Sequence, residues 1–110
     1  MIGGNTKMTI QTQTVTENAI GEQVPAWADT ITITGFLDLM SGNSGYAAYS
    51  AKVQESTHIF ICDYVPIPEG VDAENARAVI SGKTYDIMLI DNPMELREHL
   101  EIYLKYTGGQ

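Results

Sequence analysis

The stretch 55–64 (ESTHIFICDY) constrains the fold more than any other part of the chain. Its side chains alternate, with Ile59 and Ile61 on one face and Phe60 and Cys62 on the other. β-Branched and aromatic residues are favoured on a pleated surface, so the stretch predicts a β-strand. Both faces are partly apolar, so neither can meet water along its whole length. We therefore expect a strand in mid-sheet, or a barrel strand whose outer face touches a neighbouring subunit.

Other segments share this alternating, β-favouring character and are separated by turn-forming residues. Strands that follow one another through tight turns pair antiparallel. The sequence thus predicts an all-β fold, a small antiparallel β-barrel of six to seven strands, with a sandwich as the alternative. A long loop or short helix is expected at 41–55, between the second and third main strands. The other predicted strand segments are 8–15, 23–29, 30–40, 77–80, 83–91 and 99–107.

The same alternation predicts which side chains fill the core. Gly35 interrupts one strand segment, which indicates a bulge or a sharp bend. Trp27, two residues after Pro25, is interpreted as a packing residue of the core or its rim, with an interface role as the alternative. The predicted core residues are Ile10, Trp27, Ile33, Leu37, Ile59, Ile61, Tyr85, Ile87, Leu89, Leu100, Ile102 and Leu104.

The chain length of 110 residues is typical of one domain with its own core. We expect a flexible N-terminal arm at 1–7, one barrel domain at 8–107 and a tail at 108–110. Cys62 is the only cysteine, so no internal disulfide can form. The sequence has no apolar run of about 18 residues, so we expect no membrane-spanning helix.

The charge balance is acidic. Fourteen Asp and Glu residues against six Lys and Arg give a formal net charge of −8. Such a surface repels a phosphate backbone, which argues against duplex binding through a basic patch. It suits a basic protein partner or a conduit to which DNA must not adhere, and solubility alone is the other explanation.

The residues that could carry catalysis do not form a recognisable motif. His58 and Cys62 share a strand face but lie four residues, about 13 Å, apart, too far to share one metal ion. The sequence shows no nucleophile elbow, no glycine-rich phosphate loop and no EF-hand spacing. We therefore expect no enzyme activity, no metal and no cofactor, and we interpret His58 and His99 as hydrogen-bonded strand residues.

The strands carry the stability of the fold, so the two long connections, 41–55 and 64–76, are free to carry function. The first of them contains Tyr46 and Tyr49. Exposed tyrosines in such a loop favour a protein contact, and docking against their own barrel is the alternative. The candidate residues for a partner interface or a channel loop are Ser41, Gly42, Asn43, Tyr46, Tyr49 and Lys52.

Several short motifs follow one another at characteristic spacings. They are TIQ at 9–11, GE at 21–22 with Trp27 after it, SG at 41–42, ESTHI at 55–59, GKTYDI at 82–87 and NP at 92–93. Their order over about residues 8–106 resembles the phage head-tail joining family, the head closure or completion proteins of long-tailed phages. The chain departs from this family at 94–98 (MELRE), where many relatives carry several arginines.

The resemblance implies a structural virion protein and not an enzyme. Its relatives form a ring, of about twelve copies, under the portal and adaptor proteins of a filled head. Such a ring retains DNA, which passes without sequence-specific binding, and offers a platform to the tail completion protein. A long loop can line or plug the channel, and 41–55 is the candidate here. The implied location is the virion, with the host bacterial cytoplasm before assembly and no membrane contact.

Two alternatives remain open from the sequence. One is a tail completion or terminator subunit, which is also a small β-rich ring former. The other is a non-catalytic β-barrel module that binds protein. A nucleic-acid-binding barrel is disfavoured, because such a surface needs aromatics flanked by Lys or Arg, and the basic residues here are spread singly.

Overall fold

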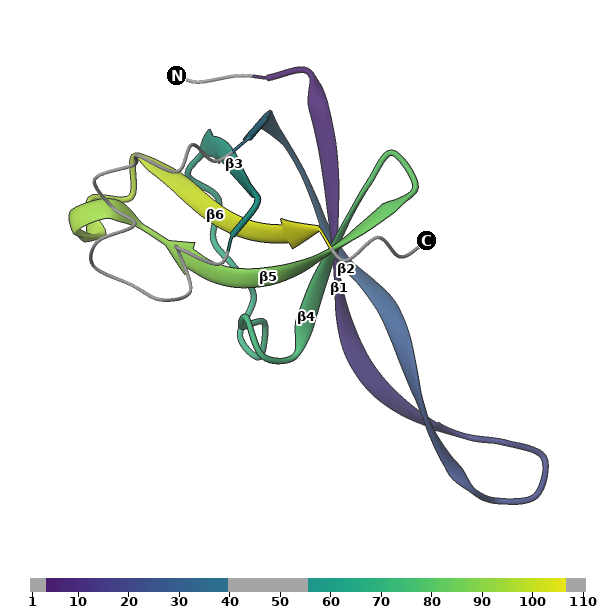
Figure 1. The fold of residues 1–110 in the computed structure, drawn as a ribbon. Helices are drawn as coiled ribbons and strands as arrows, with labels where there is room; N and C mark the ends of the chain where they lie inside the picture. Colours follow the sequence, from purple (N-terminus) through teal and green to yellow (C-terminus); the bar gives the residue numbers. More distant parts are fainter. Residues whose placement is uncertain (1–3, 40–55, 107–110) are drawn as a thin grey trace.

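The computed structural model describes residues 4–39 and 56–106, and within them six antiparallel strands close into a barrel (Figure 1). The order around the barrel is β1-β2-β3-β6-β5-β4. The predicted all-β barrel of six to seven strands is therefore confirmed, and 41–55 lies outside the described residues. The strands are β1 (Thr6–Glu17), β2 (Gln23–Leu39), β3 (His58–Asp63), β4 (Ala76–Ile80), β5 (Lys83–Asp91) and β6 (His99–Tyr106), with the 3₁₀ turn η2 (Pro93–Glu95) before β6.

Closure of the barrel depends on β1, which pairs with a strand on each side. It pairs with β2 along its whole length and with β4 from Thr9 to Thr12. β1 begins at Thr6, so part of the predicted N-terminal arm belongs to the sheet. Beyond Thr12, one further backbone hydrogen bond among the described residues joins β1 to the residue that precedes β4, from the Gln13 N–H to the Asn75 carbonyl. The β1–β2 hairpin therefore leaves the barrel as a two-stranded ribbon.

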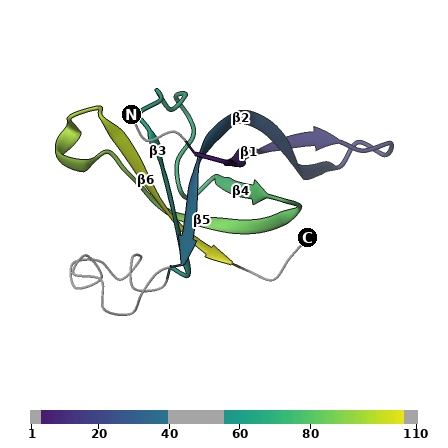
Figure 2. The same ribbon diagram turned by 90° about the horizontal axis from the view of Figure 1, so that it is seen from above.

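This hairpin gives the protein its elongated shape, 50 × 26 × 25 Å (Figures 1 and 2). The segments predicted as two strands, 23–29 and 30–40, form the single strand β2, which has 17 residues. At Pro25, which lies opposite Val15 of β1, β2 has a partner strand on one side only. Its pairing with β3 is confined to Phe36–Leu39. The missing N–H of Pro25 falls in the part of β2 that is an edge strand.

The core lies inside the barrel and takes one face of each strand. Phe60 is fully buried at its centre, and Leu37 packs against the cluster from β2. The buried cluster is Met8, Ile10, Ile33, Phe60, Cys62, Ala76, Ala78, Ile80, Tyr85, Ile87, Leu100, Ile102 and Leu104.

The structure corrects the predicted core in β3. Ile59 and Ile61 are half-buried on the outer face, whereas Phe60 and Cys62 point inward. Both faces of this strand are apolar, so alternation alone cannot say which face is inside. The partner strand decides it, because Phe60 lies opposite the buried Ile102 of β6.

A second correction concerns Leu89 in β5. The register between β5 and β6 shifts between Ile87 and Leu89. Such a β-bulge reverses the alternation that follows it. Leu89 therefore lies on the outer face, opposite Tyr103. Ile90 lies opposite Ile102 on the inner face and packs against the core cluster.

Trp27 is the third correction, because it lies outside the barrel. It faces Gln13 in the projecting part of the hairpin, and 37% of its surface is exposed. The core ends where β1 leaves β4, so a residue opposite Gln13 has no barrel interior to enter. The predicted core position of Trp27 is therefore wrong, and the interface role given as its alternative stays a prediction.

Gly35 marks the point at which β2 changes partner, from β1 to β3. A Cβ at this position would lie 2.5 Å from the Ile61 carbonyl oxygen and 2.9 Å from both Cys62 Cβ and the Phe60 ring. Of the expected bulge or sharp bend, the bulge is not at Gly35, because the register shift of the β1–β2 pair lies between Ile10 and Gln11. Gly35 instead permits a close approach of two strands.

Candidate interaction surface

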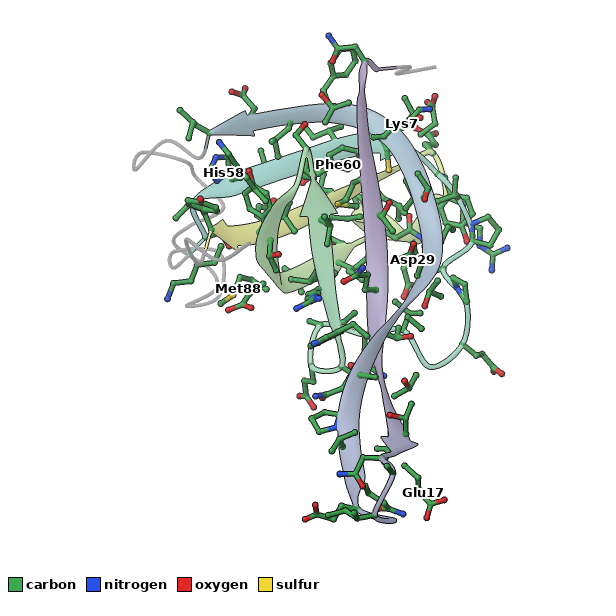
Figure 3. The ribbon with its side chains drawn as sticks, turned by 90° about the vertical axis from the view of Figure 1, so that its right-hand side faces the viewer. Lys7, Glu17, Asp29, His58, Phe60 and Met88 are labelled. Atoms are coloured by element: carbon green, nitrogen blue, oxygen red, sulfur yellow. The ribbon has the colours of Figure 1, made fainter. Side chains whose placement is uncertain are left out.

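The hairpin extension, which we define as residues 13–29, is the most exposed part of the described residues (Figure 3). No residue within it is fully buried. It nevertheless carries three large hydrophobic side chains, Val15, Ile20 and Trp27, which are 63%, 79% and 37% exposed. Apolar residues gathered on a projecting ribbon, which has no core to stabilise it, are typical of a protein-binding element.

The tip of the extension is held by Asn18. The Asn18 Oδ1 accepts hydrogen bonds from the backbone N–H groups of Ile20 (3.1 Å) and Glu22 (2.9 Å). The Asn18 N–H donates to the Glu22 carbonyl at 2.9 Å, and Gly21 takes the left-handed conformation (φ 84°). This Asx-type turn presents Ile20 at the end of the ribbon.

One face of the extension combines apolar and polar pairs across the two strands. Val15 lies opposite Pro25, and the next pair on the same face is Gln13 with Trp27. Because side chains alternate, this face is distinct from the one that carries Thr14. The other face is composed of small, uncharged residues: Thr14, Thr16, Val24, Ala26 and Ala28.

A polar network fixes the base of the extension to the barrel. The Arg77 Nε donates to Gln11 Oε1 at 2.8 Å, and the Gln11 Nε2 donates to Asp29 Oδ1 at 2.9 Å. The Arg77 guanidinium carbon lies 4.3 Å from the centre of the Trp27 ring. A cation over an indole face is attractive and restrains the ring. The Trp27 side chain is therefore held in one orientation by Arg77, although part of it is exposed.

The extension is also acidic. From Met8 to Ala51 the sequence contains no Lys or Arg, and the extension itself carries Glu17, Glu22 and Asp29. Exposed edge strands usually carry Lys, which discourages unwanted pairing. On this ribbon the edges carry Pro25 and carboxylates in place of Lys, so the exposed surface is acidic as well as partly apolar.

Aromatic side chains and one lysine gather at the β4–β5 turn. The His58 ring meets the Tyr85 ring edge-on at 5.2 Å, and the Tyr85 ring lies 5.3 Å from that of Tyr106. Lys83 Nζ lies 6.0 Å from the centre of the Tyr106 ring, which is 38% exposed. Burial and, to a smaller extent, the nearby Tyr106 raise the pKa of Tyr85. This end of the barrel therefore combines an exposed aromatic ring with a cation.

The interface or channel residues predicted from the sequence, Ser41, Gly42, Asn43, Tyr46, Tyr49 and Lys52, lie outside the described residues. On either side of this segment, Leu39 is strongly exposed and Ser56 is buried. The extension was not among the predicted sites. The sequence signal nearest to it is the run of 44 residues without a basic side chain, which by itself does not mark a projecting ribbon.

Both histidines make local contacts. His99 Nε2 lies 3.0 Å from Glu101 Oε2, and the Tyr103 hydroxyl donates to Glu101 Oε1 at 2.9 Å. His58 Nδ1 and the Thr57 hydroxyl are 2.7 Å apart. Among the residues that the structure describes, no three His, Cys, Asp or Glu side chains are grouped to hold a metal ion. No helix in the described ranges is long and apolar enough to cross a membrane.

The comparisons with known proteins agree with this architecture. A family model described as phage head completion protein matches residues 4–105. The chain belongs to this family. Head completion proteins are structural components of the virion that interact with other head and tail proteins, and this protein shares that role.

A solved relative shows the same fold. It is the solution structure of protein SF1141 from Shigella flexneri 2a, which is 21% identical to this chain. The match covers 98% of this chain and 96% of SF1141, with a TM-score of 0.72. At this identity the likeness establishes the fold alone. A comparison with curated proteins finds no match.

Proposed function

We propose that this head completion protein forms a ring beneath the portal and adaptor proteins of a DNA-filled phage head. The ring retains the packaged DNA and provides the platform on which the tail docks. The observation that carries the proposal is the family match over residues 4–105. The barrel supports it as a rigid subunit, and the hairpin extension supplies a projecting surface for contact with a neighbour.

The charge of the protein is consistent with a DNA conduit. A formal net charge of −8 repels the phosphate backbone, so DNA can pass such a ring without adhering to it. The segment 41–55 remains the proposed channel loop on sequence grounds. Deletion of 42–52 is then expected to leave a folded barrel but to produce heads that leak DNA.

The proposal is tested with heads from the encoding phage that lack only this protein. Purified protein is added to the DNA-filled heads, and nuclease-protected DNA is measured before and after tails are supplied. We expect protection of the DNA and joining of tails. Binding to isolated tails rather than to heads would instead identify a tail completion subunit and overturn the head-closure role.

A further inference from the structure

The two ends of the molecule differ in charge. Figure 3 shows Lys7 at one end of β1 and Glu17 at the other, on the hairpin extension. The extension contains three carboxylates and no cation. Lys7 lies at the end of β1 that faces the β4–β5 turn, because Thr9 pairs with Val79. The acidic ribbon and the lysines near this turn therefore occupy opposite ends of the hairpin.

At the far end, Lys83 lies near an exposed aromatic ring, that of Tyr106. Lys83 and Lys105 are exposed, and Tyr106 rests on Tyr85 with Lys83 near its face. We call Lys83 and Tyr106 the lysine–tyrosine corner; Lys105 precedes Tyr106 in β6 and therefore points to the other face of the sheet. One carboxylate, Asp86, lies opposite Lys105 in the β5–β6 pair and offsets part of its charge. Lys83 forms no ion pair with the described residues.

The corner complements the extension in both charge and chemistry. The extension presents Glu17 and Glu22 near its tip, with Val15 and part of Trp27 exposed on one face. At the base of this face the Arg77 guanidinium lies over the Trp27 ring, so the acidic part of the face is the part toward the tip. Carboxylates beside apolar side chains match a surface on which a lysine lies beside an aromatic ring. Trp and Tyr are also the residue types that most often dominate interface energies.

The arrangement of the two surfaces decides what kind of assembly they can form. Figure 1 shows the extension and the β4–β5 turn pointing away from the barrel in different directions, and Figure 3 shows the extension running away from the Lys7 end. A donor surface and a different acceptor surface on one chain make a head-to-tail contact. Repetition of such a contact closes into a ring when the rotation permits.

We propose that the hairpin extension of one copy docks on the lysine–tyrosine corner of the next copy in the ring. This inference rests on the proposed function and specifies the contact between its subunits. Glu17 and Glu22 face Lys83 of the neighbouring copy, and Trp27 and Val15 lie against its Tyr106. The contact covers apolar side chains that the ribbon exposes in the single chain.

Cross-linking in loaded heads tests the contact. Glu17→Cys and Lys83→Cys are combined in one chain, loaded onto DNA-filled heads that lack the protein, and oxidised. Cys62 is fully buried and does not compete. We expect a ladder of covalent multimers. The matched control, Glu69→Cys with Lys83→Cys, moves the first cysteine to an exposed position of the β3–β4 connection and should give no ladder.

Charge exchange provides the second measurement. Glu17→Lys or Lys83→Glu alone should lower loading onto heads by about tenfold, and the two together should restore it. Glu69→Lys, which makes the same charge change away from the extension, should load normally. All these positions are exposed, so the fold should survive, and thermal unfolding verifies that it does.

The outcomes separate this inference from the proposed function. If wild-type protein does not load onto heads, the proposed function falls and this contact falls with it. If wild-type protein loads but the paired cysteines give no ladder and the single charge reversals load normally, only the contact is overturned. If the charge reversals reduce loading but the paired cysteines link the chain to a different head protein, the extension docks on that protein and the second copy is excluded.

Discussion

Gly35 shows how one missing side chain permits the barrel to close. At this residue β2 passes from β1 to β3, so its backbone approaches both neighbours at once. A methyl group here would meet the Ile61 carbonyl oxygen, a backbone atom that cannot move without displacing β3. The sequence indicated a special role for this glycine but not its nature, because close approach and a bulge leave the same signature.

Substitution Gly35→Ala should therefore destabilise the protein. We expect a loss of about 2–3 kcal/mol in the free energy of unfolding, at the upper end of the cost of overpacking. Urea denaturation followed by circular dichroism measures this loss. Thr34→Ala, at the adjacent exposed position of β2, is the matched control and should change stability little. An equal stability of Gly35→Ala and the wild type would contradict the close approach.

Cys62 connects burial to pH. Desolvation by burial and, next, the charge of Asp63 raise the pKa of its thiol from 9.0 to about 11. In the unfolded chain the thiol loses its proton near pH 9.0, whereas the folded protein retains the proton to about pH 11. The unfolded state therefore binds fewer protons in this window, and stability falls as pH rises.

We predict that the free energy of unfolding is insensitive to this group below pH 9.0 and decreases between pH 9.0 and about 11. Urea denaturation at a series of pH values, repeated with Cys62→Ala, measures the effect. The decline of stability at alkaline pH should be shallower in the variant, because the contribution of the Cys62 thiol is removed. Some decline should remain in both proteins, because the pKa of Tyr85 is also raised. Parallel declines in the two proteins would show that the thiol does not titrate as described.

At the scale of the element, the hairpin extension depends on the barrel for its orientation. Its link is the chain from Arg77 through Gln11 to Asp29, which crosses three strands, with Trp27 held under the guanidinium. An isolated two-stranded ribbon is marginally stable in water. This link therefore determines how rigidly the extension is presented.

The substitution Arg77→Ala should loosen the extension and leave the barrel intact. Loss of an exposed cation–π contact of about 0.5–1 kcal/mol predicts amide hydrogen exchange about two- to fivefold faster in the extension. The fluorescence of the single tryptophan should shift to longer wavelength. Lys7→Ala, at the other end of β1, serves as the control, and unchanged exchange in Arg77→Ala would refute the link.

The elements also show what the sequence could and could not predict. In β6 the inward residues Leu100, Ile102 and Leu104 follow directly from alternation with charged or polar neighbours, although Tyr103 on the outer face is buried as well. In β3 both faces are apolar, and in β5 a bulge reverses the pattern, so the inner face there depends on the partner strand. Pairing between distant strands is a tertiary property that local alternation does not contain.

The candidate surface was missed for a similar reason. Trp27 has the local sequence of a strand residue, and its exposure follows only from the end of the β1–β4 pairing at Thr12. The lack of basic residues between Lys7 and Lys52 was visible in the sequence. That charge pattern has meaning only once the structure shows a ribbon that leaves the barrel.

At the scale of the whole molecule, the barrel should fold without the extension. All the residues of the buried cluster lie outside 13–29, so replacing 13–27 by an Asn-Gly turn between Thr12 and Ala28 should preserve cooperative thermal unfolding. The shortened chain should fail to load onto DNA-filled heads, because the proposed contact between copies is removed. Normal loading of this variant, counted per head, would show that the extension is dispensable.

The most direct test of head closure is imaging of the assembled particle by electron cryo-microscopy. We predict a ring of this chain directly beneath the portal and adaptor of DNA-filled heads, with each hairpin extension lying on the next subunit. A ring of this chain at the tail end remote from the head, or particles that hold their DNA with no such ring at the vertex, would contradict the account.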